Sequence, residues 1–94
     1  MPVLVSKKLI VFLDSFIYPS LHMKYKYMCG RLGKEILRIR REKNLSQDNL
    51  VVNCNMDRSY LAEIEEGKAN PSLKVLCKIA DGLNIRLCQL FTNI

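Results

Sequence analysis

This chain of 94 residues has little of what most metal sites and catalytic sites require. It has a single histidine, His22, and none of its four cysteines forms a C-x-x-C pair, whereas structural zinc sites are built from such pairs together with histidines. The sequence also has no acid pair of catalytic type, no glycine-rich phosphate loop and no cysteine–histidine arrangement. We therefore expect no metal, no cofactor and no enzymatic activity.

Long apolar runs are missing as well. No stretch of about 18 apolar residues occurs, so we expect no membrane span. The start of the chain is similar to a signal peptide because Lys7 and Lys8 precede an apolar run, but Asp14 ends that run and no small-residue cleavage site follows. We therefore expect the protein to remain in the cytoplasm.

Most of the cysteines lie within apolar helical patterns, which argues against a disulfide framework. In a reducing cytoplasm a free cysteine behaves as a small hydrophobic residue. The pattern predicts small, buried thiols at Cys29, Cys54, Cys77 and Cys88.

What the chain does contain is apolar residues and positive charge. Its length suits one compact domain, and 49% hydrophobic residues are enough to form a core. The formal net charge of +6 favours a polyanionic partner, nucleic acid first and an anionic membrane second.

The two parts of the chain differ in composition and in the residues that mark helix ends. Residues 1–29 form an extension with two prolines, and helical spacing of apolar residues predicts a short helix that ends before Pro19. The β-branched residues between Val3 and Val11 favour a strand instead. An arm, and translation starting at Met28, are further alternatives that the sequence leaves open. The residues with helical spacing are Leu9, Phe12, Leu13, Phe16 and Ile17.

Residues 30–94 form the predicted domain, an all-α bundle of five helices. The first helix spans about residues 31–43. The fourth begins after Ser72, an N-cap residue type, and the fifth is short, at about residues 85–91. The inward residues that we expect in the first and fourth helices are Leu32, Ile36, Ile39, Leu73, Leu76, Cys77, Ile79 and Ala80.

The second and third helices are joined by a turn of three to four residues, which is the layout of a helix-turn-helix. Ser46 and Asp57 stand where N-caps are needed, while Asn55 and Gly67 tolerate the left-handed backbone that ends a helix. The third helix has an apolar inner stripe and a polar outer face, as a helix in a major groove about 12 Å wide requires. Its inner residues are Leu61 and Ile64, and its outer residues are Arg58, Ser59, Ala62 and Glu63.

The segments LGKEILRIRREKNLSQDNL and DRSYLAEIEEGKANPSLKVLCKIADGLNIRLCQLF resemble the phage-repressor-like helix-turn-helix family over about residues 31–91. The stretch from Asp57 to Leu61 is most similar to the controller proteins of bacterial restriction–modification systems. The resemblance implies a cytoplasmic, nucleoid-associated transcriptional regulator that binds a double-stranded DNA operator.

The resemblance also implies roles for individual residues. Arg58 would contact guanine with two hydrogen bonds, and Arg40 and Glu65 would form an internal ion pair that joins the first helix to the third. For Tyr60, a position at the edge of the core is equally compatible with the sequence. The implied base contacts are Arg58, Ser59, Tyr60 and Glu63, and the implied phosphate contacts are Gln47, Lys68, Asn70 and Ser72.

Three positions depart from the family pattern. Val51 replaces an alanine and Asn55 replaces a glycine, and Asn49 stands where an acid usually completes the capping box. We expect the box to be weakened at Asn49 and the two helices to be spread slightly by Val51.

A single recognition helix reads too few base pairs to mark a site, so we predict a homodimer on a palindrome. RNA polymerase is a candidate further partner. An antitoxin that binds DNA and a protein toxin is the main alternative, and a protein-interaction module that has lost DNA binding is another. The residues expected in the dimer interface are Ile85, Leu87, Leu90, Phe91 and Ile94.

Overall fold

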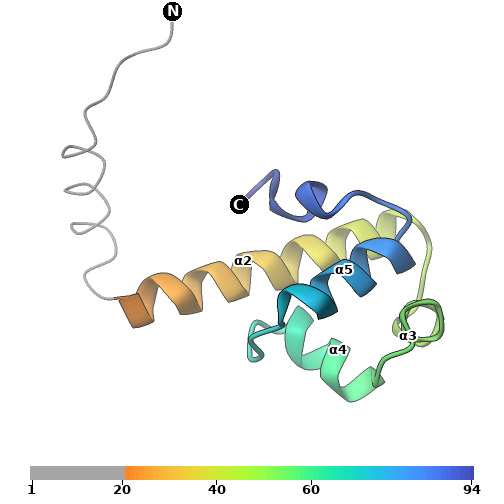
Figure 1. The fold of residues 1–94 in the computed structure, drawn as a ribbon, viewed down its shortest axis with the longest axis horizontal. Coiled ribbons are helices and arrows are strands. Elements are labelled where there is room, and N and C mark those ends of the chain that lie inside the picture. The colour runs from red at the N-terminus through yellow and green to blue at the C-terminus, as the bar shows by residue number, and fades with distance from the viewer. Residues whose placement is uncertain (1–20) are drawn as a thin grey trace, which may run out of the picture.

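A computed structural model describes residues 21–94, with side chains from Lys24 onward. The prediction for residues 9–17 lies outside this range. The described chain is all-α, as predicted, and has no strand (Figure 1). Its elements are α2 (Leu21–Glu42), α3 (Gln47–Cys54), α4 (Arg58–Glu65), α5 (Leu73–Gly82) and the 3-10 helix η1 (Leu87–Phe91). The predicted fifth α-helix is therefore wrong, because that segment forms a single short 3-10 helix.

Helix α2 begins at Leu21, ten residues before the predicted start of the first helix. Gly30 does not interrupt it, and a Cβ atom at that position would meet nothing outside the adjoining helix backbone within 4 Å. The helix ends where Asn44 adopts a left-handed backbone with φ of 57°, and Arg40 and Arg41 lie in the last turn, where the helix dipole favours positive charge.

The start of α3 is held by a complete capping box. The Ser46 hydroxyl accepts from the backbone N–H of Asn49 at 3.0 Å, and the Asn49 side-chain oxygen accepts from the backbone N–H of Ser46 at 3.1 Å. The expected weakening of the box is wrong, because an amide oxygen accepts this hydrogen bond as a carboxylate would. The helix ends at Asn55, whose φ of 54° lies in the left-handed region, as predicted.

Capping also fixes α4 and α5. The Asp57 carboxylate accepts from the backbone N–H of Ser59 at 3.3 Å, and the Ser72 hydroxyl accepts from the backbone N–H of Val75 at 3.2 Å. Helix α5 buries Leu76, Ile79 and Ala80 as predicted. The prediction is wrong for Leu73, which is 66% exposed, and for Cys77, which is also exposed. Leu73 lies in the first turn of α5, and Cys77 follows it by one turn along the solvent side.

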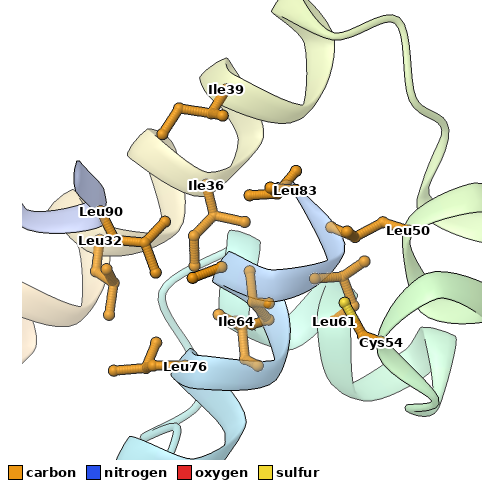
Figure 2. Close-up of a cluster of buried hydrophobic side chains, with 12 residues drawn as sticks. Leu32, Ile36, Ile39, Leu50, Cys54, Leu61, Ile64, Leu76, Leu83 and Leu90 are labelled. Atoms are coloured by element: carbon orange, nitrogen blue, oxygen red, sulfur yellow. The ribbon is translucent and has the colours of Figure 1, made fainter. Parts of the chain in front are cut away.

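The core is one cluster to which all five elements contribute (Figure 2). Of the cysteines, only Cys54 is buried in it. Cys29 is half-buried, and the prediction of buried thiols is wrong for Cys77 and Cys88, which are exposed. All four thiols are free. The core residues are Leu32, Ile36, Ile39, Leu50, Cys54, Leu61, Ile64, Leu76, Ile79, Ala80, Leu83 and Leu90.

Close backbone contact sets the position of α4 against α2. A Cβ atom at Gly33 would lie 2.2 Å from the backbone oxygen of Ile64. Such a distance is well inside van der Waals contact, so any larger side chain at Gly33 would push α4 outward. The glycine therefore determines how far the outer face of α4 stands from the body of the molecule.

Candidate nucleic-acid interface

Helices α3 and α4 form the helix-turn-helix, and the turn between them comprises residues 55–57. The left-handed Asn55 reverses the chain direction, and Asp57 caps α4. Helix α4 buries Leu61 and Ile64, as the sequence predicts. Its opposite face exposes Arg58, Ser59 and Glu63, so the three polar residues expected on the outer face share one side of a short, capped helix.

Arg58 lies across the N-terminus of α3. Its Nη1 is 3.3 Å from Oδ1 of Asp48, and its Nε donates to Oε1 of Gln47 at 3.5 Å. The Arg58 and Asp48 side chains are 62% and 69% exposed, so solvent screens the attraction between them and the ion pair is weak. Asp48 was not among the predicted site residues. The only available signal was that both residues belong to first turns that meet across the helix-turn-helix.

Arg40 and Glu65 form the second ion pair of this region. Arg40 Nε donates to Glu65 Oε2 at 2.7 Å and Nη2 donates to Oε1 at 3.0 Å, which is a bidentate contact. The two side chains are only 10% and 4% exposed. Arg40 Nη1 also donates to the backbone oxygen of Leu45 at 2.8 Å. The pair thus joins α2, the loop before α3 and the end of α4.

Gln47 links the buried pair to the exposed one. Its Nε2 donates to Glu65 Oε1 at 2.8 Å, and its Oε1 accepts from Arg58. A continuous chain of hydrogen bonds therefore runs from Arg40 through Glu65 and Gln47 to Arg58. Sequence reasoning found the four residues but not this connection, because three separate elements contribute them.

The loop after α4 carries the remaining predicted phosphate contacts. Lys68 and Asn70 are exposed, and Lys68 Nζ lies 3.0 Å from Glu66 Oε2. The hydrogen bond to Glu66 raises the pKa of Lys68 above its ordinary value. Ser72 is exposed and caps α5 with its oxygen, which leaves its hydroxyl hydrogen free to donate.

Tyr60 lies at the edge of the core. It is half-buried and packs against the hydrophobic cluster. Partial burial raises the pKa of Tyr25, on the first turns of α2, and its hydrogen bond to Cys29 and electrostatic interactions with Cys29 and Tyr60 raise it further. The start of α2 therefore lies near a side chain of α4.

The predicted dimer residues do not all lie on the surface. Ile85, Leu87 and Ile94 are half-buried and Phe91 is 41% exposed. The prediction is wrong for Leu90, which has no exposed surface and belongs to the core of the single chain. Figure 2 draws its side chain in the same buried cluster as Leu32, so Leu90 offers no surface to a partner chain.

Metal and membrane sites are not seen within the described part of the chain. Residues 21–94 contain no cluster of three or more histidine, cysteine or acidic side chains that could bind a metal ion. No helix in this range has the length and apolar character needed to cross a membrane.

Comparisons with known proteins place the fold in a family. A helix-turn-helix family model matches residues 36–90. The control protein C.MunI of a Mycoplasma species is 43% identical over 65 residues, which cover 68% of this chain and 88% of that protein. The crystal structure of the restriction–modification controller protein C.AhdI from Aeromonas hydrophila superposes with a TM-score of 0.68 at 34% identity, over 69% of this chain and 98% of that one.

A further solved structure shows a relative in a complex. The controller protein C.Esp1396I, a tetramer bound to its natural 35-base-pair operator, superposes with a TM-score of 0.66 at 31% identity over 69% of this chain and 86% of that chain. The family match spans more than half of the chain and includes all of α3, α4 and α5. This chain therefore belongs to the helix-turn-helix family, and it is similar to restriction–modification controller proteins.

Proposed function

We propose that this protein is a DNA-binding transcriptional regulator of the restriction–modification controller type. The observation that carries the proposal is the exposed polar face of α4, held on a short capped helix directly after a tight turn. A helix of this kind fits the major groove with its first turn toward the base edges. The similarity of the chain to several controller proteins favours a controller over an antitoxin.

In this proposal Arg58 reads guanine. Its guanidinium donates two hydrogen bonds to O6 and N7, a contact worth about 1–3 kcal/mol of discrimination. The exposed pair with Asp48 gives way at little cost when DNA arrives. Ser59 and Glu63 lie on the same face and reach neighbouring base edges, and Tyr60 reaches them only from the margin of the core.

Backbone contacts would fix the register of α4 on the duplex. Gln47 uses one amide hydrogen for Glu65, and its second hydrogen can donate to a phosphate beside the backbone N–H groups at the start of α3. Lys68, Asn70 and Ser72 would contact phosphates on the other side of α4. Such contacts position the protein without reading sequence.

We further propose that the protein binds a palindromic operator as a homodimer. Two recognition helices must then stand about 34 Å apart, one turn of DNA. The dimer interface would exclude the buried Leu90 and be formed by Ile85, Leu87, Phe91 and Ile94. Activation at such an operator would act through contact with RNA polymerase. The protein would then work in the bacterial cytoplasm, at the nucleoid.

Selection from a pool of random duplexes tests the proposal. The wild-type chain should enrich a palindrome, and Arg58→Ala should lose preference at one guanine in each half-site. Arg41→Ala is the matched control, because it removes an exposed arginine from the end of α2 and should leave the selected motif unchanged. Failure of the wild-type chain to enrich any motif would refute the proposal.

A further inference from the structure

The first turns of α2 lie outside the matched family segment, yet they contact the loop that follows α4. Gly67 has a φ of +77°, and a Cβ atom at this position would lie 2.8 Å from the Cα of Gly30. The backbones of α2 and of this loop therefore touch. Figure 1 shows the start of α2 extending beyond α4 and α5 on the side of that loop.

A hollow of about 380 Å³ lies between these two segments. Among the described residues, the charged ones in its lining are Lys26 and Lys68, and none of the lining residues is acidic. Tyr25 and Ala69 also line the hollow and add apolar surface to it. The remaining lining residues are Cys29 and Gly67.

Both lysines are available to an anion. Lys26 is exposed on α2. Lys68 is 73% exposed and contacts Glu66, which is itself 55% exposed, so this ion pair is screened and readily exchanged for a stronger one. The DNA backbone complements this lining. Its phosphate carries the negative charge that the lysines attract, and the carbon atoms of the adjoining sugar can pack against apolar surface.

We propose that this hollow binds the sugar–phosphate backbone of DNA that flanks the base pairs read by α4. Lys26 and Lys68 contact the phosphate, and the sugar packs against Tyr25 and Ala69. The inference rests on the proposed function, because Lys68 lies in the loop three residues after the last residue of α4, and a duplex bound to α4 must pass beside that loop. The start of α2 thereby extends the footprint of the helix-turn-helix along the DNA.

The test uses the full chain with Lys26→Gln, and Lys34→Gln as the matched control. Lys34 is also exposed on α2 and carries the same charge, but it does not line the hollow. Binding is measured over a range of salt concentrations to the duplex that the wild-type chain selects, once with long flanks and once trimmed to the selected base pairs. A random-sequence duplex of the longer length completes the set.

On long duplexes, Lys26→Gln should reduce the slope of log affinity against log salt by about 0.9, the value for one phosphate contact. The loss should be the same on selected and random sequences, and it should disappear on the trimmed duplex. Hydroxyl-radical cleavage should show sugars in the flank that are protected by the wild-type chain and not by Lys26→Gln.

Equal slopes for the two lysine variants on long duplexes, or an equal loss on long and trimmed duplexes, would overturn the inference. Arg58→Ala separates this failure from failure of the proposed function. It should remove the preference for one guanine in each half-site of the selected duplex while leaving the contribution of Lys26 to the salt slope in place. If the wild-type chain shows no salt-dependent binding to any duplex, both proposals are wrong.

Discussion

Two arginine–carboxylate pairs, Arg40–Glu65 and Arg58–Asp48, are linked through Gln47 and differ most in burial. Arg40 and Glu65 are 10% and 4% exposed and bind through two hydrogen bonds, whereas Arg58 and Asp48 are more than half exposed and approach only to 3.3 Å. Breaking the first pair leaves a charge without a partner inside the protein, and breaking the second returns both charges to water. The same chemistry therefore holds the fold in one place and leaves a side chain available for binding in the other.

Removing the buried acid should have the largest effect. Glu65→Gln leaves Arg40 buried without its charged partner and also disturbs the bond from Gln47, so we expect a loss of about 3–5 kcal/mol in the free energy of unfolding. Urea denaturation measures it. Glu66→Gln, one residue away and exposed, is the control and should change stability by less than about 1 kcal/mol. A similarly small loss of stability in both variants would show that the buried Arg40–Glu65 pair stabilises the fold no more than an exposed ion pair does.

Removing the exposed arginine should affect binding and not folding. Arg58→Ala should leave the urea midpoint nearly unchanged and cost about 1–3 kcal/mol of discrimination at one guanine in each half-site. Competition between duplexes that differ at that base pair measures the discrimination. Destabilisation comparable to that of Glu65→Gln would contradict the assignment of Arg58 to the surface.

Removing the exposed acid should have a smaller effect of opposite sign. Asp48→Asn frees Arg58 and removes a negative charge near the phosphates, so affinity for every duplex should rise while stability changes by less than about 1 kcal/mol. Fluorescence anisotropy with selected and random duplexes measures this. Weaker binding would indicate that Asp48 orients Arg58 rather than competing for it.

The smallest effect concerns an acid away from α4. The hydrogen bond from Arg38 holds the pKa of Glu35 below its ordinary value, with further help from Asn93 against the opposing effect of burial. The folded form therefore gains stability from ionised Glu35 above the pKa of the unfolded chain, and loses it as pH falls through the lowered value. The stability difference between wild type and Glu35→Gln should shrink as pH falls below about 4, near the unfolded pKa of a glutamate. A difference independent of pH would rule out this linkage.

Local signals made the helix-turn-helix predictable. Ser46, Asp57 and Ser72 are N-cap residues at helix starts, and Asn55 and Gly67 have the left-handed backbone expected of them. Each of these features depends on a few neighbouring residues, so sequence alone identifies it. The family resemblance added the roles of Arg40 and Glu65, which are 25 residues apart.

What the sequence did not reveal depends on distant parts of the chain. Leu90 reads as a surface residue of a short apolar helix, and only the packing of η1 on α2 and α5 buries it. The predicted boundary at residue 30 lies within α2, which begins at Leu21. The contact of Asp48 with Arg58 and that of Gln47 with Glu65 require α3 and α4 to be placed in space.

The most direct test of the central claim combines a protein change with a single-atom change in the DNA. Replacing the contacted guanine by 7-deazaguanine removes the N7 acceptor. Wild type should bind the modified operator more weakly than the unmodified one, and Arg58→Ala should bind both equally, because the donor to N7 is already gone. An equal loss for wild type and Arg58→Ala would mean that Arg58 does not read that guanine, and would contradict the account of α4 as the reading helix.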